Sequence, residues 1–400
     1  RPRIAVVDMA VVAGSPAGSC VLAEVQGLAA QFDVTVFSER FEPAGLPGVE
    51  LVRVRAPDRP VLFRYVAFHL GVPMHYLLWR LRGGRADCVQ ATQGQLPGAA
   101  ICYAHFCHRA YLKTHWHKSA VDGPRRWARL AMHRFNAWCE AAAISRAQLV
   151  VAPSVGLARE LVAEYPACAA KIRVVANPVA TAHFTRPHAF DRPAARERLG
   201  FAPQQIVLGF MALGDFSRKG LGLLLEALAA LPPVQRDALG LLVVGGRAGE
   251  IAEFEAMAER LSLAAGVRFV GMQQDVRPFL WACDVFAFPS AYEIFSLAVM
   301  QAAAAGLPVL VCDGVYGSEE FVVDGRNGWS IARDPRALAT WFERLLAERE
   351  RLPAMGAAAA ASVEVYDLKT FQARWSTLIG ALVAGTDTQP RAVAGEPGDR

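Results

Sequence analysis

The stretch IVLGFMALGDFSRKGLGLLLEAL, residues 206–228, contains the unit from which the fold of this chain is built. It opens with a run of apolar and β-branched residues, which is typical of a parallel strand buried on both faces. Gly214 lies in the turn that ends this run, and a helix is expected over 220–230. A buried strand, a glycine-containing turn and a helix in this order predict a doubly wound α/β sheet.

The same alternation fills both halves of the chain. In the first half, expected strands run from Ile4–Val12 to Leu149–Ala152 with helices between them. A polar, proline-rich segment follows Val175, and the alternation then restarts. We therefore predict two Rossmann-like domains, over residues 1–180 and 181–366. A C-terminal helix over 367–384 is expected to pack back on the first domain, and residues 385–400 are expected to form a disordered tail.

The predicted fold also locates the ligands. In open α/β sheets, ligands bind beyond the carboxyl ends of the strands. Two sheets that face each other with these ends would enclose one deep cleft. The predicted fold class is therefore α/β, with two Rossmann-like doubly wound domains facing across a cleft.

Composition narrows the classes of function. Of the 400 residues, 54% are hydrophobic and 20% are charged, which is typical of folded domains. A net charge of +5 is too small to produce an electrostatic field that attracts nucleic acid. The 37 arginines against 5 lysines are typical of a protein from a GC-rich bacterial genome. The eight cysteines form no CxxC pair or zinc motif, and no apolar run suits a membrane span or signal peptide. We expect a reducing cytoplasm, with no metal and no other cofactor.

Two cations follow the strand of the opening stretch. Arg218 and Lys219 lie between Gly214 and the expected helix. A glycine lets the backbone approach a ligand, and a helix start presents unpaired N–H groups and a positive dipole end. These features predict a phosphate site. The alternative is a solvated basic pair in front of a surface helix.

A single carboxylate stands out in FPSAYEIFSLAVMQAAAAGLPV, residues 288–309. Glu293 is the only charged residue between Asp284 and Asp313, and it follows an expected strand at the end where ligands collect. A carboxylate there can accept hydrogen bonds from sugar hydroxyl groups. Alternatively, Glu293 only interacts with the positive end of the following helix.

The helix after Glu293 begins with a capping residue. Ser296 is expected to cap it, and the first amides, near Phe295 and Leu297, would form a second anion cradle. Gln301 lies two turns farther along this helix. It is either part of the site or ordinary helix surface.

Taken together, these motifs resemble those of the retaining GT-B glycosyltransferases of family 4. Members of that family carry a Lys-Gly helix start, then E-x7-E, and then G-x-P-V. The resemblance covers residues 150–380 well and the N-terminal domain weakly. The matching segments are Arg218-Lys219-Gly220, Glu293, GLPV at Gly306–Val309, GSEEFVVDGRNGW at Gly317–Trp329, and a domain-crossing segment at Ala152–Val179.

The resemblance implies an activity. It implies retaining, metal-independent transfer of a sugar from a UDP- or GDP-linked donor to a hydroxyl group of a glycan or lipid-linked acceptor. Bacterial cell-surface polysaccharide or glycolipid synthesis is the expected setting. The leaving phosphate oxygen could itself take the acceptor proton on the same face, so that no enzymatic base is needed.

The resemblance also assigns roles to the donor-side residues. Arg218 and Lys219 would bind the donor diphosphate, and Glu293 would bind hydroxyl groups of the donor sugar. Gln301 takes the position of the second glutamate, which binds the ribose in the family. Asp215 stands where many members carry an arginine. At these two positions the contacts with the donor must differ from those of the family.

In the N-terminal domain, a histidine follows an expected strand. His105, in ICYAHFCHRAYL, resembles the family's cleft-facing histidine, which lies near the donor sugar and the acceptor. His108 competes for this role, and either histidine could instead be satisfied within the fold. Gly14 and Gly18, in the first strand-to-helix loop, are the candidates for approaching the diphosphate from this side.

Two segments of the first half combine apolar, aromatic and basic residues. They are 61–82, in which a helix broken near Pro73 is expected, and 108–140, which includes most of a long helix over 125–146. Such composition favours an anionic membrane surface, so a lipid-linked acceptor could be presented there at the inner membrane. The alternative is ordinary packing against the sheet.

The sequence leaves other functions open. An oxidoreductase is disfavoured because VVGGRAG, Val243–Gly249, lacks the GxGxxG pattern. A sugar-nucleotide epimerase or a phosphorylase would keep the fold and change the chemistry. A degenerate sugar-nucleotide binder without activity is the remaining alternative, raised by Gln301 and Asp215.

Overall fold

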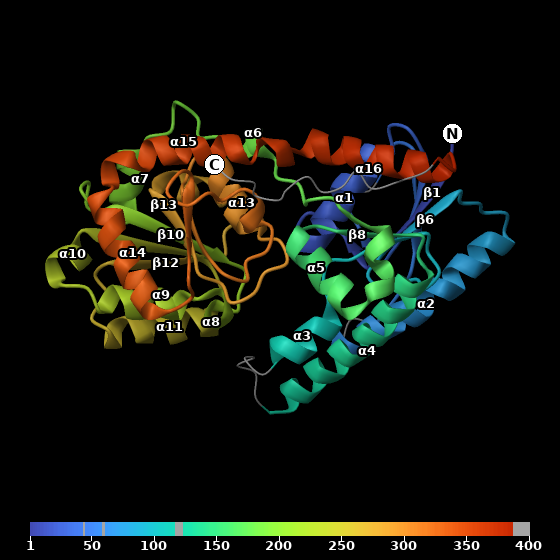
Figure 1. The fold of residues 1–400 in the computed structure, drawn as a ribbon, viewed down its shortest axis with the longest axis horizontal. Coiled ribbons are helices and arrows are strands. Elements are labelled where there is room, and N and C mark those ends of the chain that lie inside the picture. The colour runs from blue at the N-terminus through green and yellow to red at the C-terminus, as the bar shows by residue number, and fades with distance from the viewer. Residues whose placement is uncertain (43–44, 58–60, 117–122, 387–400) are drawn as a thin grey trace. The chain divides into compact units, whose positions relative to one another are not determined.

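In a computed structural model, the chain divides into two units (Figure 1). Unit 1 comprises Arg1–Pro178 and the chain from Lys369 onward, and unit 2 comprises Val179–Leu368. The expected tail lies outside the described residues from 387 onward. The structure describes residues 1–42, 45–57, 61–116 and 123–386.

Unit 1 is built on a parallel sheet of seven strands in the order β5-β3-β1-β6-β7-β8-β9. The order runs outward from β1 on both sides, which places a topological switch point beside β1. The strands are β1 (Arg3–Val7), β3 (Asp33–Ser38), β5 (Val49–Arg53), β6 (Cys88–Thr92), β7 (Ile101–Tyr103), β8 (Leu149–Ala152) and β9 (Ile172–Val174), and β2 (Ala10–Val11) pairs apart from them with β4 (Arg40–Phe41). The helices are α1 (Pro16–Leu28), α2 (Val61–Leu81), α3 (His108–Thr114), α4 (Pro124–Arg146) and α5 (Val155–Glu164).

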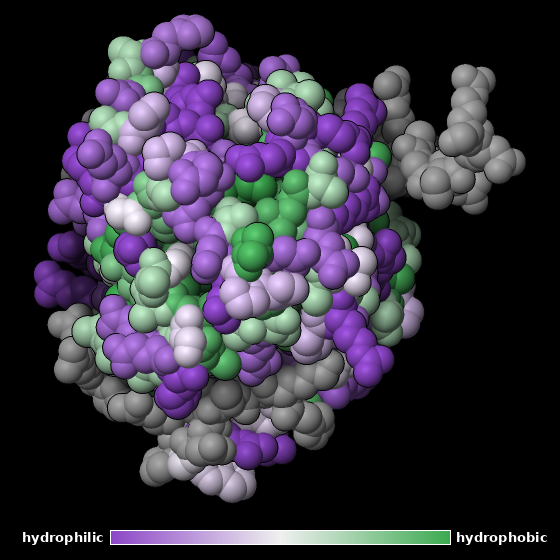
Figure 2. Space-filling model, turned by 90° about the vertical axis from the view of Figure 1, so that its left-hand side faces the viewer, coloured by the Kyte–Doolittle hydropathy of each residue, from purple (hydrophilic) through white to green (hydrophobic). Residues whose placement is uncertain are grey.

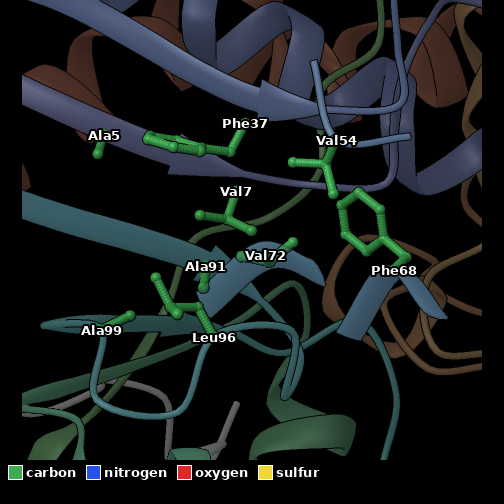
Figure 3. Close-up of a cluster of buried hydrophobic side chains, with 9 residues drawn as sticks. All are labelled: Ala5, Val7, Phe37, Val54, Phe68, Val72, Ala91, Leu96 and Ala99. Atoms are coloured by element: carbon green, nitrogen blue, oxygen red, sulfur yellow. The ribbon is translucent and has the colours of Figure 1, made fainter. Parts of the chain in front are cut away.

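One face of this sheet is covered by α2. Phe68 and Val72 of α2 pack with Val7 and Phe37 of the strands in a fully buried cluster (Figure 3). Apolar side chains from both faces of β1, β3 and β8 are buried, as their continuous apolar runs predict, whereas the edge strands β5 and β9 are only partly buried or exposed.

The expected break of α2 near Pro73 is wrong, because the helix runs unbroken from Val61 to Leu81. Proline removes one backbone hydrogen bond from a helix. Here the proline ring is exposed, while the neighbouring Val72 anchors the helix in the core. None of the helices in the described residues is long and apolar enough to cross a membrane.

The last helix, α16 (Leu368–Val383), belongs to unit 1. Its Trp375 is fully buried, with its ring 4.8 Å from that of Tyr103. The Gln372 side chain donates a hydrogen bond to the Ala23 carbonyl at 3.1 Å. The chain therefore returns to the unit in which it started.

Unit 2 repeats the design with six parallel strands in the order β12-β11-β10-β13-β14-β15. The order reverses beside β10, so the loops after β10 and β13 flank the switch point. The strands are β10 (Ile206–Ala212), β11 (Leu239–Gly245), β12 (Val267–Gly271), β13 (Val285–Phe288), β14 (Val309–Cys312) and β15 (Gly328–Ile331). The helices are α6 (Thr181–Phe184), α7 (Arg192–Arg198), α8 (Phe216–Lys219), α9 (Leu221–Ala229), α10 (Pro233–Asp237), α11 (Ala248–Arg260), α12 (Arg277–Ala282), α13 (Leu297–Ala304), α14 (Pro335–Ala347) and α15 (Leu352–Ser362).

The helix expected over 220–230 is preceded by a short one. A single turn, α8, ends at Gly220, which has a φ of +90° and connects it to α9. Asp215, before α8, also has a positive φ, of +62°. These two left-handed residues turn the backbone sharply just where the sequence carries its cation pair.

Candidate functional site

The candidate site of unit 2 is made by the loops that follow β10 and β13. They approach so closely that a Cβ atom at Gly220 would lie 2.3 Å from the carbonyl oxygen of Pro289. The amide of Ala291 donates to the Arg218 carbonyl at 2.9 Å, which fastens the second loop to the first. Gly220 is therefore required both by its φ and by this contact.

Three donors converge on one carboxylate oxygen, Oε1 of Glu293. Arg218 Nη1 lies 3.1 Å from it, and Ser290 Oγ donates to it at 2.9 Å. Lys219 Nζ binds the same oxygen. Sequence analysis identified the two cations and the carboxylate separately, and the structure brings all three together.

These groups are largely shielded from water. The side chains of Glu293 and Lys219 are only 13% and 16% exposed, and that of Arg218 is 32% exposed. Burial lowers the pKa of Lys219, although the Glu293 carboxylate opposes this effect. For Arg218, burial acts in the same direction, but the carboxylates of Glu293 and Asp215 outweigh it and raise the pKa. Both side chains form ion pairs with the Glu293 carboxylate.

Arg218 has further partners. Its Nε binds Asp215 Oδ2 at 2.7 Å, and its Nη1 donates to the Tyr292 carbonyl at 2.5 Å. The residue that departs from the family pattern, Asp215, is thus a counter-ion of Arg218 and competes with any phosphate for it. The Lys219 ammonium lies 5.3 Å from the centre of the Phe288 ring, which attracts a cation.

The helix start after Gly214 differs from the expectation. The Phe216 amide at the start of α8 donates to Glu250 Oε1 at 2.6 Å. A carboxylate from α11 thus occupies the amide that was expected to face a phosphate. In this arrangement the anion-binding capacity of the loop resides in the side chains of Arg218 and Lys219.

The second helix start follows the predicted pattern of capping. Ser296 caps α13, and its Oγ accepts a hydrogen bond from the Val299 amide at 3.4 Å. Phe295 is buried beside Gly317, where an added Cβ would lie 2.5 Å from its ring. Leu297 and Gln301 are both partly exposed on α13.

Sequence reasoning missed Ser290, Glu250 and Arg333. Ser290 directly follows the apolar β13 and Pro289, and this position at a strand end was its only signal. Glu250 and Arg333 carry no such signal, because they come from distant segments. Arg333 Nε donates to the Pro289 carbonyl at 2.9 Å and supports the loop from the other side.

In unit 1, the structure separates the two candidate histidines. His105 follows β7, its ring lies 4.0 Å from that of Tyr103, and its buried Nε2 has no hydrogen-bond partner. Burial lowers its pKa to about 4, so the imidazole is neutral at pH 7. His108 is instead buried, with its Nδ1 3.0 Å from that of His133. Its amide donates to Glu140 at 2.8 Å. His108 thus holds α3 against α4, and of the two candidates His105 has a ring nitrogen without a partner, a feature that His69 of α2 shares.

Another unpartnered polar atom follows β6, the strand that pairs with β7. Gln95 Oε1, just beyond the carboxyl end of β6, is buried without a hydrogen-bond partner, and Thr92, at that end, interacts with the Asp8 carboxyl group. Asp8, after β1, is buried as well, and this burial raises its pKa. Polar atoms left unpaired at strand ends are costly unless a ligand or water satisfies them.

The two glycines of the first loop have different surroundings. An added Cβ at Gly18 would lie 1.8 Å from the Ala10 carbonyl oxygen, so this glycine lets α1 pack closely against β2. Gly14 has open space around its Cα. Ser15 between them caps α1 by accepting from the Gly18 amide at 3.3 Å. Gly18 is explained by packing, and Gly14 is left as the loop candidate.

A cavity of about 860 Å³ lies at the other end of the unit 2 sheet, where β10 and β13 begin. Figure 2 faces this end of unit 2, with polar residues around a patch of apolar ones. Arg192 and Arg196 line the cavity, and both bind the Asp284 carboxylate. They also donate to carbonyls at the end of α12, so we interpret them as fastening α7 to the start of β13.

Within the described ranges, no group of three or more His, Cys, Asp or Glu side chains is placed to hold a metal ion.

Two family models match the chain. Residues 17–183 match the model described as Glycosyltransferase Family 4, and residues 205–348 match the one described as Glycosyl transferases group 1. Together they cover most of both units.

Curated relatives match over shorter lengths. D-inositol 3-phosphate glycosyltransferase 2 from Catenulispora acidiphila is 34% identical over 246 residues, which are 56% of this chain and 56% of the relative. Lipopolysaccharide glucosyltransferase WaaG from Escherichia coli is 35% identical over 142 residues, 36% of this chain and 37% of the relative. The chain thus spans about half the length, or less, of these relatives.

Solved structures match over nearly the whole chain. The crystal structure of WaaG has a TM-score of 0.75 at 21% identity and covers 94% of this chain and 99% of its own. Anabaena HepE in complex with UDP and glucose has a TM-score of 0.71 at 20% identity and covers 95% of this chain and 100% of its own. These likenesses confirm the predicted fold.

Proposed function

The chain belongs to glycosyltransferase family 4 and has the GT-B fold, and from this premise we propose that it transfers a sugar from a nucleotide-sugar donor to an acceptor hydroxyl group with retention of configuration. One observation carries the proposal. Arg218, Lys219 and Glu293 converge beyond the carboxyl ends of two neighbouring strands at a switch point, where ligands of such sheets bind.

The chemistry of the transfer explains this convergence. Negative charge develops on the departing diphosphate, and two cations held in place before the reaction stabilise it without reorganisation. When the diphosphate binds, it replaces Glu293 as the partner of Lys219 and Arg218. Glu293 then accepts hydrogen bonds from hydroxyl groups of the donor sugar. Because two side-chain cations meet the diphosphate charge, the proposed transfer needs no metal ion.

The donor and the proton transfer are also part of the proposal. A uridine donor is the first candidate, supported by the structures of HepE with UDP and UDP-glucose; a guanosine donor is the second. Retention of configuration follows if the leaving phosphate oxygen takes the acceptor proton on the face it has just left. Gln301 would contact the ribose as an uncharged donor and acceptor.

The acceptor would bind on the side of unit 1. We assign His105 to it, because its unpartnered Nε2 is a neutral imidazole nitrogen that can bind a hydroxyl group. The acceptor is a glycan or lipid-linked sugar of a bacterial cell-surface polysaccharide or glycolipid, reached from the cytoplasmic side. The lipopolysaccharide and inositol phosphate enzymes among the relatives support this class.

A thermal-shift titration tests the donor site. UDP, GDP, ADP and their sugar conjugates are added with and without EDTA. Stabilisation by one nucleotide family that persists in EDTA is expected, because a ligand that binds only the folded state raises Tm. Hydrolysis or transfer of the stabilising sugar nucleotide, with the product anomer read by NMR, then tests transfer and retention. No stabilisation by any nucleotide, or an inverted product, would overturn the corresponding part.

A second candidate is a sugar-nucleotide binder without activity. The ion pair between Asp215 and Arg218 favours it, because it ties up a cation that the diphosphate needs. Binding without any hydrolysis or transfer would select this candidate. Restored turnover in Asp215→Asn would instead identify Asp215 as a brake on an active enzyme.

A further inference from the structure

An apolar face of α2 is exposed to solvent. Phe63, Leu70, Met74, Leu77 and Leu81 are each between 58% and 75% exposed. Their spacing puts them on one side of the helix. The opposite side carries Phe68 and Val72, which are buried in the core of unit 1 (Figure 3). The helix is therefore apolar on both sides, although only one of them packs on the sheet.

A neighbouring helix also exposes two tryptophans. His69 of α2 and Phe135 of α4 have ring centres 5.4 Å apart, and Figure 1 shows the two helices side by side. Trp127 and Trp138 of α4 are 72% and 71% exposed, at helical spacing on one side. We call the seven side chains Phe63, Leu70, Met74, Leu77, Leu81, Trp127 and Trp138 the α2–α4 surface.

The charges around this surface have one sign. The sequence contains no Asp or Glu between Asp58 and Asp87, or between Asp122 and Glu140. It contains several arginines there, and the exposed ones among the described residues are Arg80, Arg82, Arg85, Arg126 and Arg134. Exposed apolar and aromatic side chains beside exposed arginines are the composition of interfacial membrane helices.

We propose that the α2–α4 surface docks on an anionic lipid bilayer, with the apolar side chains at the boundary between headgroups and acyl chains and the arginines against the headgroups. An exposed apolar patch of this kind marks an interaction site in a folded protein. The one-signed charge favours an anionic bilayer over a second copy of the chain, because two copies would bring their arginines together. The bilayer is also where the lipid-linked acceptor of the proposed function would be found, and to that extent the inference rests on it.

Vesicle sedimentation tests the docking without any donor or acceptor. The full chain is mixed with vesicles of phosphatidylethanolamine and phosphatidylglycerol, and with vesicles of phosphatidylcholine alone. At least tenfold stronger binding to the anionic vesicles is expected, and raising the salt concentration should weaken it because exposed charges are screened. Brominated acyl chains should quench tryptophan fluorescence, and much less so in W127F/W138F.

Matched variants separate this surface from general stickiness. L70S/L77S/L81S should bind anionic vesicles at least tenfold more weakly. The control V234S removes a side chain of unit 2 that is 84% exposed and should bind like the wild type. R80S/R82S/R85S should lose the preference for anionic lipid, and R260S, which removes an exposed arginine of α11, should keep it.

The outcomes distinguish docking from catalysis. All these variants should keep the Tm increase on nucleotide binding, so a loss of vesicle binding alone concerns this surface. Wild-type-like vesicle binding by L70S/L77S/L81S, or none by the wild type, would overturn the proposal. A wild-type dimer that becomes a monomer in L70S/L77S/L81S would show that a second copy covers the surface and would overturn it too.

Discussion

Replacing Glu293 by alanine should destabilise unit 2 as well as stop transfer. The carboxylate is 13% exposed and is a partner of two cations, Arg218 and Lys219. Removing it leaves Lys219, which is 16% exposed, without this counter-ion, while Arg218 keeps Asp215 and the Tyr292 carbonyl. Breaking a buried pair by removing one partner costs about 3–5 kcal/mol. Because Arg218 stays compensated, we expect the lower end, about 3 kcal/mol.

A change of this size is measurable by thermal unfolding. For a domain of the length of unit 2, Val179–Leu368, 1 kcal/mol corresponds to about 2–4 °C, so Tm should fall by about 6–12 °C. Glu226, an exposed carboxylate on α9, supplies the control. Glu226→Ala should change the free energy of unfolding by no more than about 0.5 kcal/mol.

Nucleotide binding separates the two roles of Glu293. In the wild type, the diphosphate must displace Glu293 from Lys219 and Arg218, whereas in Glu293→Ala Glu293 no longer competes for either cation, although Arg218 still binds Asp215. UDP, or whichever nucleotide binds, should therefore raise Tm more in the variant than in the wild type, while turnover is lost because nothing orients the donor sugar. In K219M/E293A both partners are gone, so part of the lost stability should return.

Three results would refute this reasoning. An unchanged Tm in Glu293→Ala would mean that the ion cluster contributes no stability. A smaller gain from the nucleotide than in the wild type would mean that Glu293 does not compete with the diphosphate. Turnover that survives the loss of stability would leave Glu293 as a counter-ion without a role in binding the sugar.

Three further predictions follow from single positions. Gly220→Ala forces alanine into the left-handed conformation, which costs about 1–2 kcal/mol, and puts its Cβ 2.3 Å from the Pro289 carbonyl oxygen. The free energy of unfolding should therefore fall by at least about 2 kcal/mol, and the affinity for the nucleotide should fall as well. A nucleotide Kd like that of the wild type would contradict the close approach of the loops. Burial raises the pKa of Glu140 from 4.5 to about 7. Between these pH values the Glu140 carboxyl group is protonated in the folded state and ionised in the unfolded state, so the wild type loses stability as the pH rises from 4.5 to 7. The free energy of unfolding of Glu140→Gln should therefore increase relative to that of the wild type between pH 4.5 and 7, by up to about 3 kcal/mol above pH 7. A difference between the two proteins that stays constant in urea unfolding at pH 5, 6 and 8 would refute this. Gln301→Glu should tighten nucleotide binding about tenfold, because a carboxylate forms a charge-assisted hydrogen bond to the ribose. Calorimetry measures this Kd, with Gln301→Ala as the control, and an unchanged Kd would mean that the ribose binds elsewhere.

The fold was largely predictable because its signals are local. The strands β10 to β14 are short, mostly apolar runs between turns, and such runs are recognised within a few residues, whereas β15, with the sequence GWSI, has no such run and is not predicted. The errors also have local causes. Pro73 predicts a break in α2, yet core packing of its neighbours holds the helix together. The sequence predicts that a helix begins at Gly220, whereas in the structure Gly220 is a left-handed connection between two helices.

The candidate site was predictable in its members but not in their partners. Arg218, Lys219 and Glu293 each stand out at a strand end, and the sequence alone leads to the expectation that Glu293→Ala leaves folding intact. The structure adds the contacts between side chains 74 and 75 residues apart, and with them a cost in stability. Glu250, bound to the Phe216 amide 34 residues away, had no signal in the sequence.

The sequence by itself determined the order of strands and helices, and so which residues lie at the carboxyl ends of the strands. Periodicity carries this information because it depends only on near neighbours along the chain. The tertiary structure alone decided which cation meets which carboxylate, which histidine keeps a free ring nitrogen, and which side of α2 faces water. These outcomes depend on contacts between distant segments, and a helix that is apolar on both sides does not specify which side the sheet will cover.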